Sequence, residues 1–117
     1  MINEDKLVQI IADACLEEKA LDVVILEVAD LTVIADYFVI AAGRNIIQVK
    51  SIADTVEKTL KQYNILPTRE DGYQEGTWVV LDYSSTILHI FREEERNFYG
   101  LENLWGEAKR AALQNIK

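Results

Sequence analysis

Residues that build covalent or metal cross-links are scarce in this sequence. It has one cysteine, Cys15, and one histidine, His89, so neither an intrachain disulfide nor a zinc site, which needs about four Cys or His ligands, can form. It has one proline, Pro67, and no repeat or Gly/Ser-rich linker that would mark a domain boundary. We therefore expect a single domain over residues 1–117 that holds no metal or cofactor.

Long apolar runs and targeting signals are missing as well. No stretch reaches the roughly 18 apolar residues that a membrane-spanning helix needs. Residues 1–6 have neither the apolar stretch of a signal peptide nor the Arg-rich, acid-poor character of a transit peptide. The expectation is a cytoplasmic protein that does not enter a membrane.

Basic residues are few: 12 Lys and Arg stand against 20 Asp and Glu, which gives a net charge of −8. Residues 70–107 hold nine acidic side chains but only two basic ones, Arg92 and Arg96. Phosphate backbones are bound by Lys and Arg, so direct nucleic-acid binding is not expected. An acidic surface attracts a basic protein instead, although solubility alone would also account for the charge.

Hydrophobic periodicity predicts alternating helices and strands. Apolar residues recur at helical spacing after the capping residues Asn3 and Asn45, and dense β-branched runs predict strands. The predicted elements are a helix at 4–19, strands at 22–28 and 36–42, a helix at 46–63, strands at 65–69, 77–83 and 86–92, a helical turn at 93–98 and a terminal helix marked by Leu101, Leu104, Trp105, Ala108 and Ala112. This order, αββαβββα, predicts an α/β fold with a single mixed sheet of about five strands covered by helices.

Two catalytic hypotheses based on nucleotides find little support in the residues. Gly43–Asn45 lies between a predicted strand and helix, where phosphates bind, but neither GxGxxG nor GxxxxGK[ST] occurs. Metal-dependent nucleotidyl transfer needs paired strand carboxylates. Asp82 has Val80 as its neighbour on the same face, and Asp36 is followed two residues later by Phe38. Because no carboxylate pair stands at strand spacing, metal-dependent catalysis is not expected.

His89 raises a third catalytic hypothesis, general-base catalysis. Such a histidine needs a nucleophile or an orienting carboxylate beside it. Across the predicted hairpin, Asp82 or Thr86 could lie near the ring. A lone histidine on a strand is more often a structural or interface residue, so the sequence leaves both readings open.

The tract from residue 77 to residue 105 carries the strongest interaction signal. It contains six of the ten aromatic residues, namely Trp78, Tyr83, Phe91, Phe98, Tyr99 and Trp105. Strand alternation places Trp78, Val80 and Asp82 on one face of the sheet, and Val79, Leu81 and Tyr83 on the other. If one face is not covered by helices, it offers an aromatic patch rimmed by carboxylates, which suits a protein interface. The alternative is that all six rings belong to the core.

Several segments between Leu7 and Ala108 resemble one known family in order and spacing. They are 36–43 (DYFVIAAG), 48–49 (QV), 51–54 (SIAD), 78–83 (WVVLDY), 89–91 (HIF), 95–96 (ER), 98–99 (FY), 101–102 (LE) and 104–105 (LW). Together they resemble the Iojap-like ribosomal silencing factor family. Two departures concern turns: Asp71-Gly72 replaces the usual Glu-Gly, and Ser84-Ser85 replaces Gly-Asp, which puts any partner contact of that acid in doubt.

The resemblance implies a fold related to the nucleotidyltransferase sheet but without its catalytic carboxylates, and a function without catalysis. It implies binding to a basic protein on the joining face of the large ribosomal subunit, the one conventionally numbered fourteen. The bound domain then obstructs docking of the small subunit and represses translation. We expect six residues to contact this partner: Trp78, Asp82, Tyr83, His89, Arg96 and Tyr99. A nucleotide-handling enzyme and a large-subunit assembly factor remain as alternatives, and an uncovered sheet face would leave a homodimer open.

Overall fold

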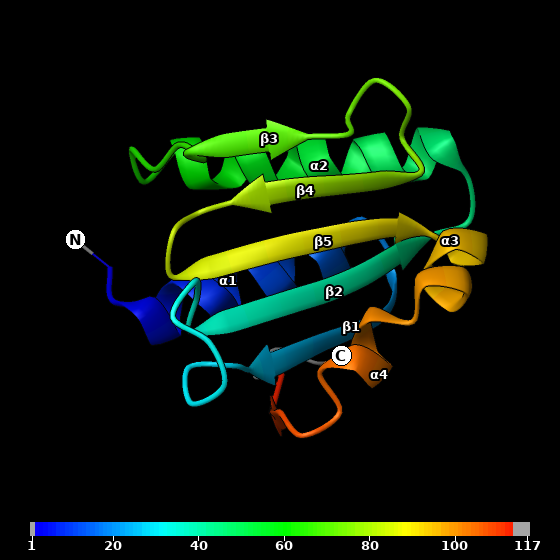
Figure 1. Cartoon of the computed structure of the whole chain (residues 1–117). Helices are drawn as coiled ribbons and strands as arrows, with labels where there is room; N and C mark the ends of the chain where they lie inside the picture. The colour runs from blue at the N-terminus through cyan, green and yellow to red at the C-terminus, as the bar shows by residue number, and fades with distance from the viewer. Residues whose placement is uncertain (1, 114–117) are drawn as a thin grey trace.

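A computed structural model of the chain describes residues 2–113 and contains one mixed sheet of six strands in the order β3-β4-β5-β2-β1-β6 (Figure 1). Strands β2 and β5 run parallel, and the other neighbouring strands run antiparallel. The elements are α1 (Glu4–Glu17), β1 (Leu21–Glu27), β2 (Tyr37–Gly43), α2 (Ile46–Lys61), β3 (Arg69–Asp71), β4 (Trp78–Asp82), β5 (Thr86–Arg92), α3 (Glu93–Tyr99), α4 (Leu101–Leu104) and β6 (Lys109–Ala111). The predicted α/β class with a mixed sheet is confirmed.

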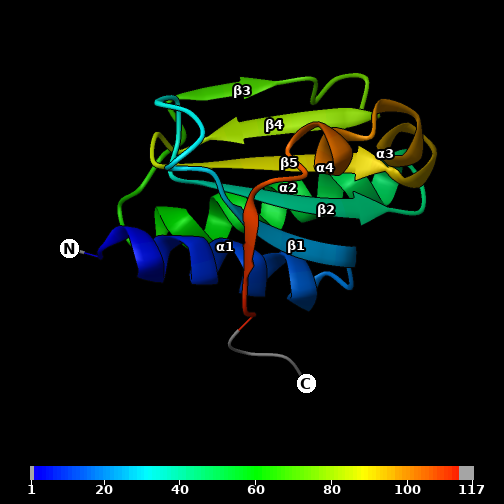
Figure 2. The same ribbon diagram turned by 60° about the horizontal axis from the view of Figure 1, so that its bottom comes forward.

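Helices α1 and α2 begin where the capping residues predict and cover the same face of the sheet (Figures 1 and 2). The side chains of Asn3 and Asn45 each accept a hydrogen bond, at 2.8 Å, from the backbone N–H three residues later. These bonds satisfy amides that have no partner inside the helix. Each helix then turns an apolar stripe toward the strands.

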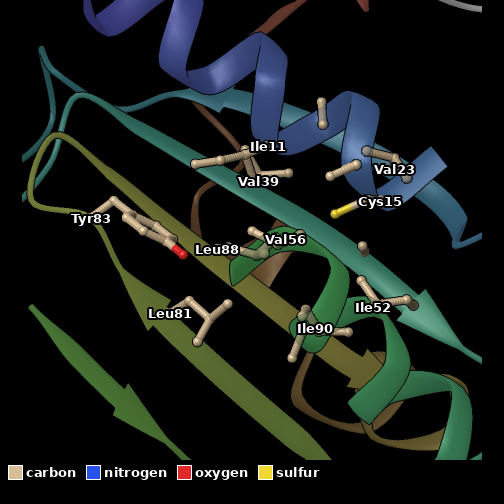
Figure 3. Packing of buried hydrophobic residues seen from close by; sticks show 14 of the residues in the cluster. Ile11, Cys15, Val23, Val39, Ile52, Val56, Leu81, Tyr83, Leu88 and Ile90 are labelled. Atoms are coloured by element: carbon tan, nitrogen blue, oxygen red, sulfur yellow. The ribbon is translucent and has the colours of Figure 1, made fainter. Parts of the chain in front are cut away.

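The main core lies between these two helices and the sheet (Figure 3). Leu88 and Ile90 of β5 contribute one side of it, and Ile52 and Val56 of α2 contribute the other. A smaller cluster lies on the opposite face of the sheet. Its buried members are Leu26, Val28, Ala35, Phe38, Ile40 and Phe91. Both faces of the central strands are therefore apolar, but only one carries long helices.

The predicted terminal helix is wrong beyond its first turn. Helix α4 ends at Leu104, and residues 109–111 form a sixth strand that pairs antiparallel with β1. Without β6, the outer edge of β1 would leave backbone N–H and C=O groups unpaired, and pairing them outweighs the helical pattern of the side chains. The count of about five strands was one too low for the same reason.

The third strand is also displaced from its predicted position at 65–69. Strand β3 spans Arg69–Asp71 and pairs with β4. Pro67 lacks an N–H and cannot donate to a ladder. Pairing begins just after it, where the backbone N–H of Thr68 donates to the carbonyl of Asp82 at 2.7 Å.

Candidate protein-binding face

The sheet face turned away from α1 and α2 is only partly covered. Helices α3 and α4 lie over one part of it, as Figure 2 shows. The strand register sets Val80 beside His89 and His89 beside Ile40 across three neighbouring strands. We call this surface the open face. Its strand residues are Val24, Leu26, Phe38, Ile40, Arg69, Asp71, Trp78, Val80, Asp82, Ile87, His89 and Phe91.

A continuous set of rings crosses the open face, and we call it the aromatic cluster. It consists of Phe38, Trp78, His89, Phe91, Phe98, Tyr99 and Trp105. The ring of Trp78 stacks on Phe91 with a centroid distance of 4.8 Å and lies 4.8 Å from Tyr99. Tyr99 is 52% exposed and Phe98 is 81% exposed. The cluster therefore runs from the core to the surface, and its solvent-exposed members lie on α3.

His89 is an acceptor in this cluster and not a poised base. The indole Nε1 of Trp78 donates to the Nδ1 of His89 at 3.2 Å, which fixes the neutral ring. Burial lowers the pKa of His89 to about 4, because the charged imidazolium would lose its hydration. Within residues 2–113, the other ring nitrogen, Nε2, is buried and has no carboxylate or hydroxyl as a hydrogen-bond partner. The histidine therefore orients Trp78 on the open face.

Arg96 ties α3 to the rest of the fold. Its Nε donates to Oε1 of Glu102 at 2.9 Å, and its Nη1 donates to the carbonyl of Leu21 at 3.2 Å. The guanidinium lowers the pKa of the Glu102 carboxyl, since it favours the charged form. Nearby, Arg92 holds Glu95 through two hydrogen bonds of 2.7 Å. Arg96 is buried, so it positions Tyr99 more than it offers itself to a partner.

The structure brings together some of the six predicted contact residues and separates others. Trp78, His89 and Tyr99 meet in the aromatic cluster. Asp82 lies on the same face at the other end of β4, where its carboxylate accepts the N–H of Ser84 at 2.8 Å.

Tyr83 is the exception, because its side chain lies on the opposite face. It is 5% exposed and packs in the main core, near Leu81 and Leu88 (Figure 3). Strand alternation separates it from Trp78, as the sequence pattern indicated. We therefore leave Tyr83 out of the contact surface considered below.

Sequence reasoning missed the part of this surface that comes from a loop. The residues between the strands predicted at 22–28 and 36–42 received neither an element nor a role from the sequence pattern. In the structure Leu31, Val33 and Ile34 are exposed apolar side chains there. The signal was present as three large aliphatic residues in a turn, where polar and small residues are usual.

The described residues offer no built site for a phosphate or a metal. At the start of α2, the N–H of Arg44 is bonded to Oε1 of Gln48 at 2.7 Å, and the N–H of Gln48 is bonded to Asn45. These amides are therefore already satisfied. Among residues 2–113, no group of three or more Cys, His, Asp or Glu side chains has the placement of a metal site. In that same range no helix has the length and apolar character needed to cross a bilayer.

A mixed sheet with long helices on one face and an aromatic, partly open second face defines a protein-binding module more readily than an enzyme. Residues 2–117 match the family model described as "Ribosomal silencing factor during starvation". The chain belongs to this family of Iojap-like ribosomal silencing factors. Members of the family regulate translation and are not enzymes.

Individual relatives agree with this assignment. The chain is 33% identical over 112 residues to a ribosomal silencing factor of Bacillus subtilis, covering 96% of this chain and 95% of the relative. A crystal structure from Bacillus halodurans superposes with a TM-score of 0.84 at 31% identity, covering 94% of this chain and 100% of that one. A mouse protein named "Mitochondrial assembly of ribosomal large subunit protein 1" is 32% identical over 95 residues, which cover 76% of this chain and 40% of the mouse protein.

Proposed function

We propose that this protein binds the large ribosomal subunit and blocks its association with the small subunit. The landing site is a basic protein on the joining face, the one conventionally numbered fourteen. A bound domain of this size obstructs subunit joining by its volume alone, so no chemistry is required. The place of action is the cytoplasm, where bacterial subunits join.

The observation that carries this proposal is the exposed end of the aromatic cluster. Tryptophan and tyrosine supply much of the binding energy at protein interfaces, because they bury large areas with few rotatable bonds. The ring centroids of the half-buried Trp78 and the exposed Tyr99 lie 4.8 Å apart on the open face. The long helices α1 and α2 cover the opposite face of the sheet and leave these rings accessible. The acidic charge of the chain makes a basic protein a better partner than ribosomal RNA.

The test is pelleting of purified large subunits with the wild type, Trp78→Ala and Tyr99→Ala. If both rings are hot spots, each variant loses affinity by about tenfold or more, which corresponds to about 1.4 kcal/mol. In a joining assay, the wild type reduces the fraction of joined ribosomes and the two variants do so less.

Tyr99→Ala guards against a folding artefact, because Trp78 also packs on Phe91 whereas Tyr99 lies largely in solvent. Ile47→Ser is the matched control, since Ile47 is 77% exposed on α2, away from the open face. Normal binding by folded Trp78→Ala and Tyr99→Ala variants would remove the aromatic cluster from the interface.

A second candidate function is assembly of the large subunit. The name of the mouse relative favours it, because that name describes assembly and not silencing. Both functions require large-subunit binding, but only silencing requires a block of joining. Binding without any effect in the joining assay would therefore support assembly.

Self-association through the open face is the remaining alternative. Apolar side chains on this face could pair with those of a second copy. Sedimentation of the free protein at increasing concentration measures this. Under the proposed function the monomer is the form that binds the subunit, so strong self-association would reduce binding.

A further inference from the structure

The loop that joins β1 to β2, residues 28–36, holds apolar side chains in solvent. Val33 is fully exposed, Ile34 is 60% exposed and Leu31 is 42% exposed. Aliphatic groups left in water forgo the stabilisation that burial gives. Three of them within four residues of one loop form a patch of the kind that marks an interaction site.

The backbone of this loop is held in place by its own hydrogen bonds. The N–H of Val28 donates to the carbonyl of Asp36 at 2.9 Å and closes the base of the loop. The N–H of Ile34 donates to the Thr32 hydroxyl at 3.2 Å. At the far end, the N–H of Asp36 donates to the carbonyl of Ser85 at 2.8 Å, next to the β4–β5 hairpin. The exposed side chains are therefore presented by an ordered loop and not by a loose one.

The loop connects two hollows on the open side of the sheet. Ile34 lines a hollow of about 230 Å³ together with Phe38, Val80, Ile87 and His89. Leu31 lines a second hollow of about 350 Å³ with residues 103–107, which follow α3. Figure 2 shows the loop and α4 on the side of the sheet opposite α1 and α2. Apolar surface thus continues from the hairpin end of the open face, across the loop, to α4.

Carboxylates dominate the charged rim of the two hollows. Asp71 and Asp82 line the first, and Glu107 lines the second. The one cation in these linings, Arg69, lies 3.5 Å from Asp71 and is partly neutralised by it. An apolar surface with an acidic rim is complementary to a partner that presents aliphatic or aromatic groups within a basic surface.

Interface size also requires more than the rings of α3. A stable interface buries about 800 Å² on each partner. A phenylalanine or tyrosine buries at most about 250 Å², so the exposed rings Phe98 and Tyr99 cannot supply that area alone. The loop and its two hollows are the adjoining apolar surface.

We propose that residues 31–34 form a second anchor for the same basic ribosomal protein that the aromatic cluster binds. Val33 and Ile34 insert between side chains of that protein, and its apolar groups fill the hollows on either side of the loop. This inference rests on the proposed function and extends its interface from the aromatic cluster to the loop between β1 and β2.

The test is binding of the Val33→Ser and Val33→Ser/Ile34→Ser variants to large subunits, with rate constants measured on immobilised subunits. Because Val33 is fully exposed, its replacement leaves the fold intact, and an unchanged melting temperature checks this. We expect the double variant to lose about tenfold in affinity, mainly through faster dissociation. Ile47→Ser, equally apolar and exposed on α2, should bind normally.

The outcomes separate this inference from the proposed function. If Trp78→Ala loses binding and the loop variants do not, the second anchor is wrong and the proposed function stands. If neither Trp78→Ala nor the loop variants lose binding, the open face is not the interface and the second anchor is wrong. The proposed function itself fails if the wild type does not pellet with large subunits or does not reduce joining. If the loop variants change self-association and leave subunit binding unaltered, the loop pairs copies of this chain, and the inference is overturned.

Discussion

Glu57 on α2 and Glu70 on β3 bring two carboxyl groups together at the edge of the sheet. Partial burial raises the pKa of Glu57 to about 7, and a hydrogen bond with Glu70 adds to the shift. The negative charge of Asp54 acts in the same direction, although the Tyr73 hydroxyl donates to Asp54 at 2.9 Å. Near neutral pH Glu57 is therefore partly protonated, and its protonated form removes the repulsion between these carboxylates where β3 lies beside the helix.

The raised pKa of Glu57 predicts a pH dependence of stability. The folded state raises the pKa of Glu57 above its ordinary 4.5, so folding binds a proton between the two values. The stabilisation is complete below the unfolded pKa and is lost as pH rises through about 7. In denaturant unfolding, the wild type should lose stability relative to Glu57→Gln between about pH 5 and about pH 8.

Glu75→Gln, in the exposed loop before β4, is the control and should follow the wild type. His89 contributes the opposite slope in both proteins, because its lowered pKa makes stability fall as pH drops from 6.5 toward about 4. This contribution of His89 cancels when the free energy of unfolding of Glu57→Gln is subtracted from that of the wild type. A difference that stays constant across this range would show that folding does not raise the pKa of Glu57.

The sequence predicts that Trp78 and Tyr83 lie on opposite faces of the sheet, but it does not predict which of the two stays accessible to a partner. Alternation along a strand assigns the two side chains to opposite faces. Which face stays open depends on where α1 and α2 pack, and both faces of β4 are apolar. The sequence-based contact list therefore included Tyr83, which the helices bury. The same uncertainty hid the role of His89, whose neighbour Phe38 comes from a distant part of the chain.

At the scale of elements, the C-terminal segment shows where periodicity succeeds and where it fails. Leu101, Trp105 and Ala108 have helical spacing, and all three do pack against the smaller cluster on the open face. The pattern thus predicted a real contact. It did not predict the backbone path, because the unpaired edge of β1 lies far away in the sequence. Long-range pairing of this kind leaves no local signal, whereas the β4–β5 hairpin, with its two-residue turn, does.

Strand β6 should stabilise the fold, because it pairs the backbone N–H and C=O groups at the outer edge of β1. The N–H of Val28 donates to Asp36. By alternation along β1, Leu26 therefore bonds to β2 and Glu27 bonds to β6. Proline at position 109 cannot donate to the ladder that pairs Lys109 with Glu27. We expect Lys109→Pro to lower the free energy of unfolding by about 1 kcal/mol or more. It should also raise self-association, since an open edge strand pairs with other chains. Denaturant unfolding and light scattering measure the two effects.

Lys109→Ala is the matched control for this variant. It removes the exposed side chain but keeps the backbone donor. If Lys109→Pro unfolds at the same denaturant concentration as Lys109→Ala, β6 contributes nothing to the edge.

At the scale of the whole molecule, net charge and apolar contact area affect different steps of binding. The net charge of −8 acts over distances longer than any contact, whereas the aromatic cluster and the β1–β2 loop act only once the surfaces meet. Long-range attraction sets the rate of association, and buried apolar contacts set the rate of dissociation. The two contributions can therefore be separated by changing the ionic strength.

Binding to large subunits should slow as salt is added. The Debye length falls from about 30 Å at 0.01 M to about 8 Å at 0.15 M ionic strength, so the acidic chain and its basic partner attract each other over a shorter range. We expect the association rate constant to fall by about tenfold or more over this interval, with little change in dissociation. Trp78→Ala should show the same salt dependence with faster dissociation, because it removes contact area and no charge. An association rate that does not respond to salt would mean that the partner surface is not basic, even if the open face is where it binds.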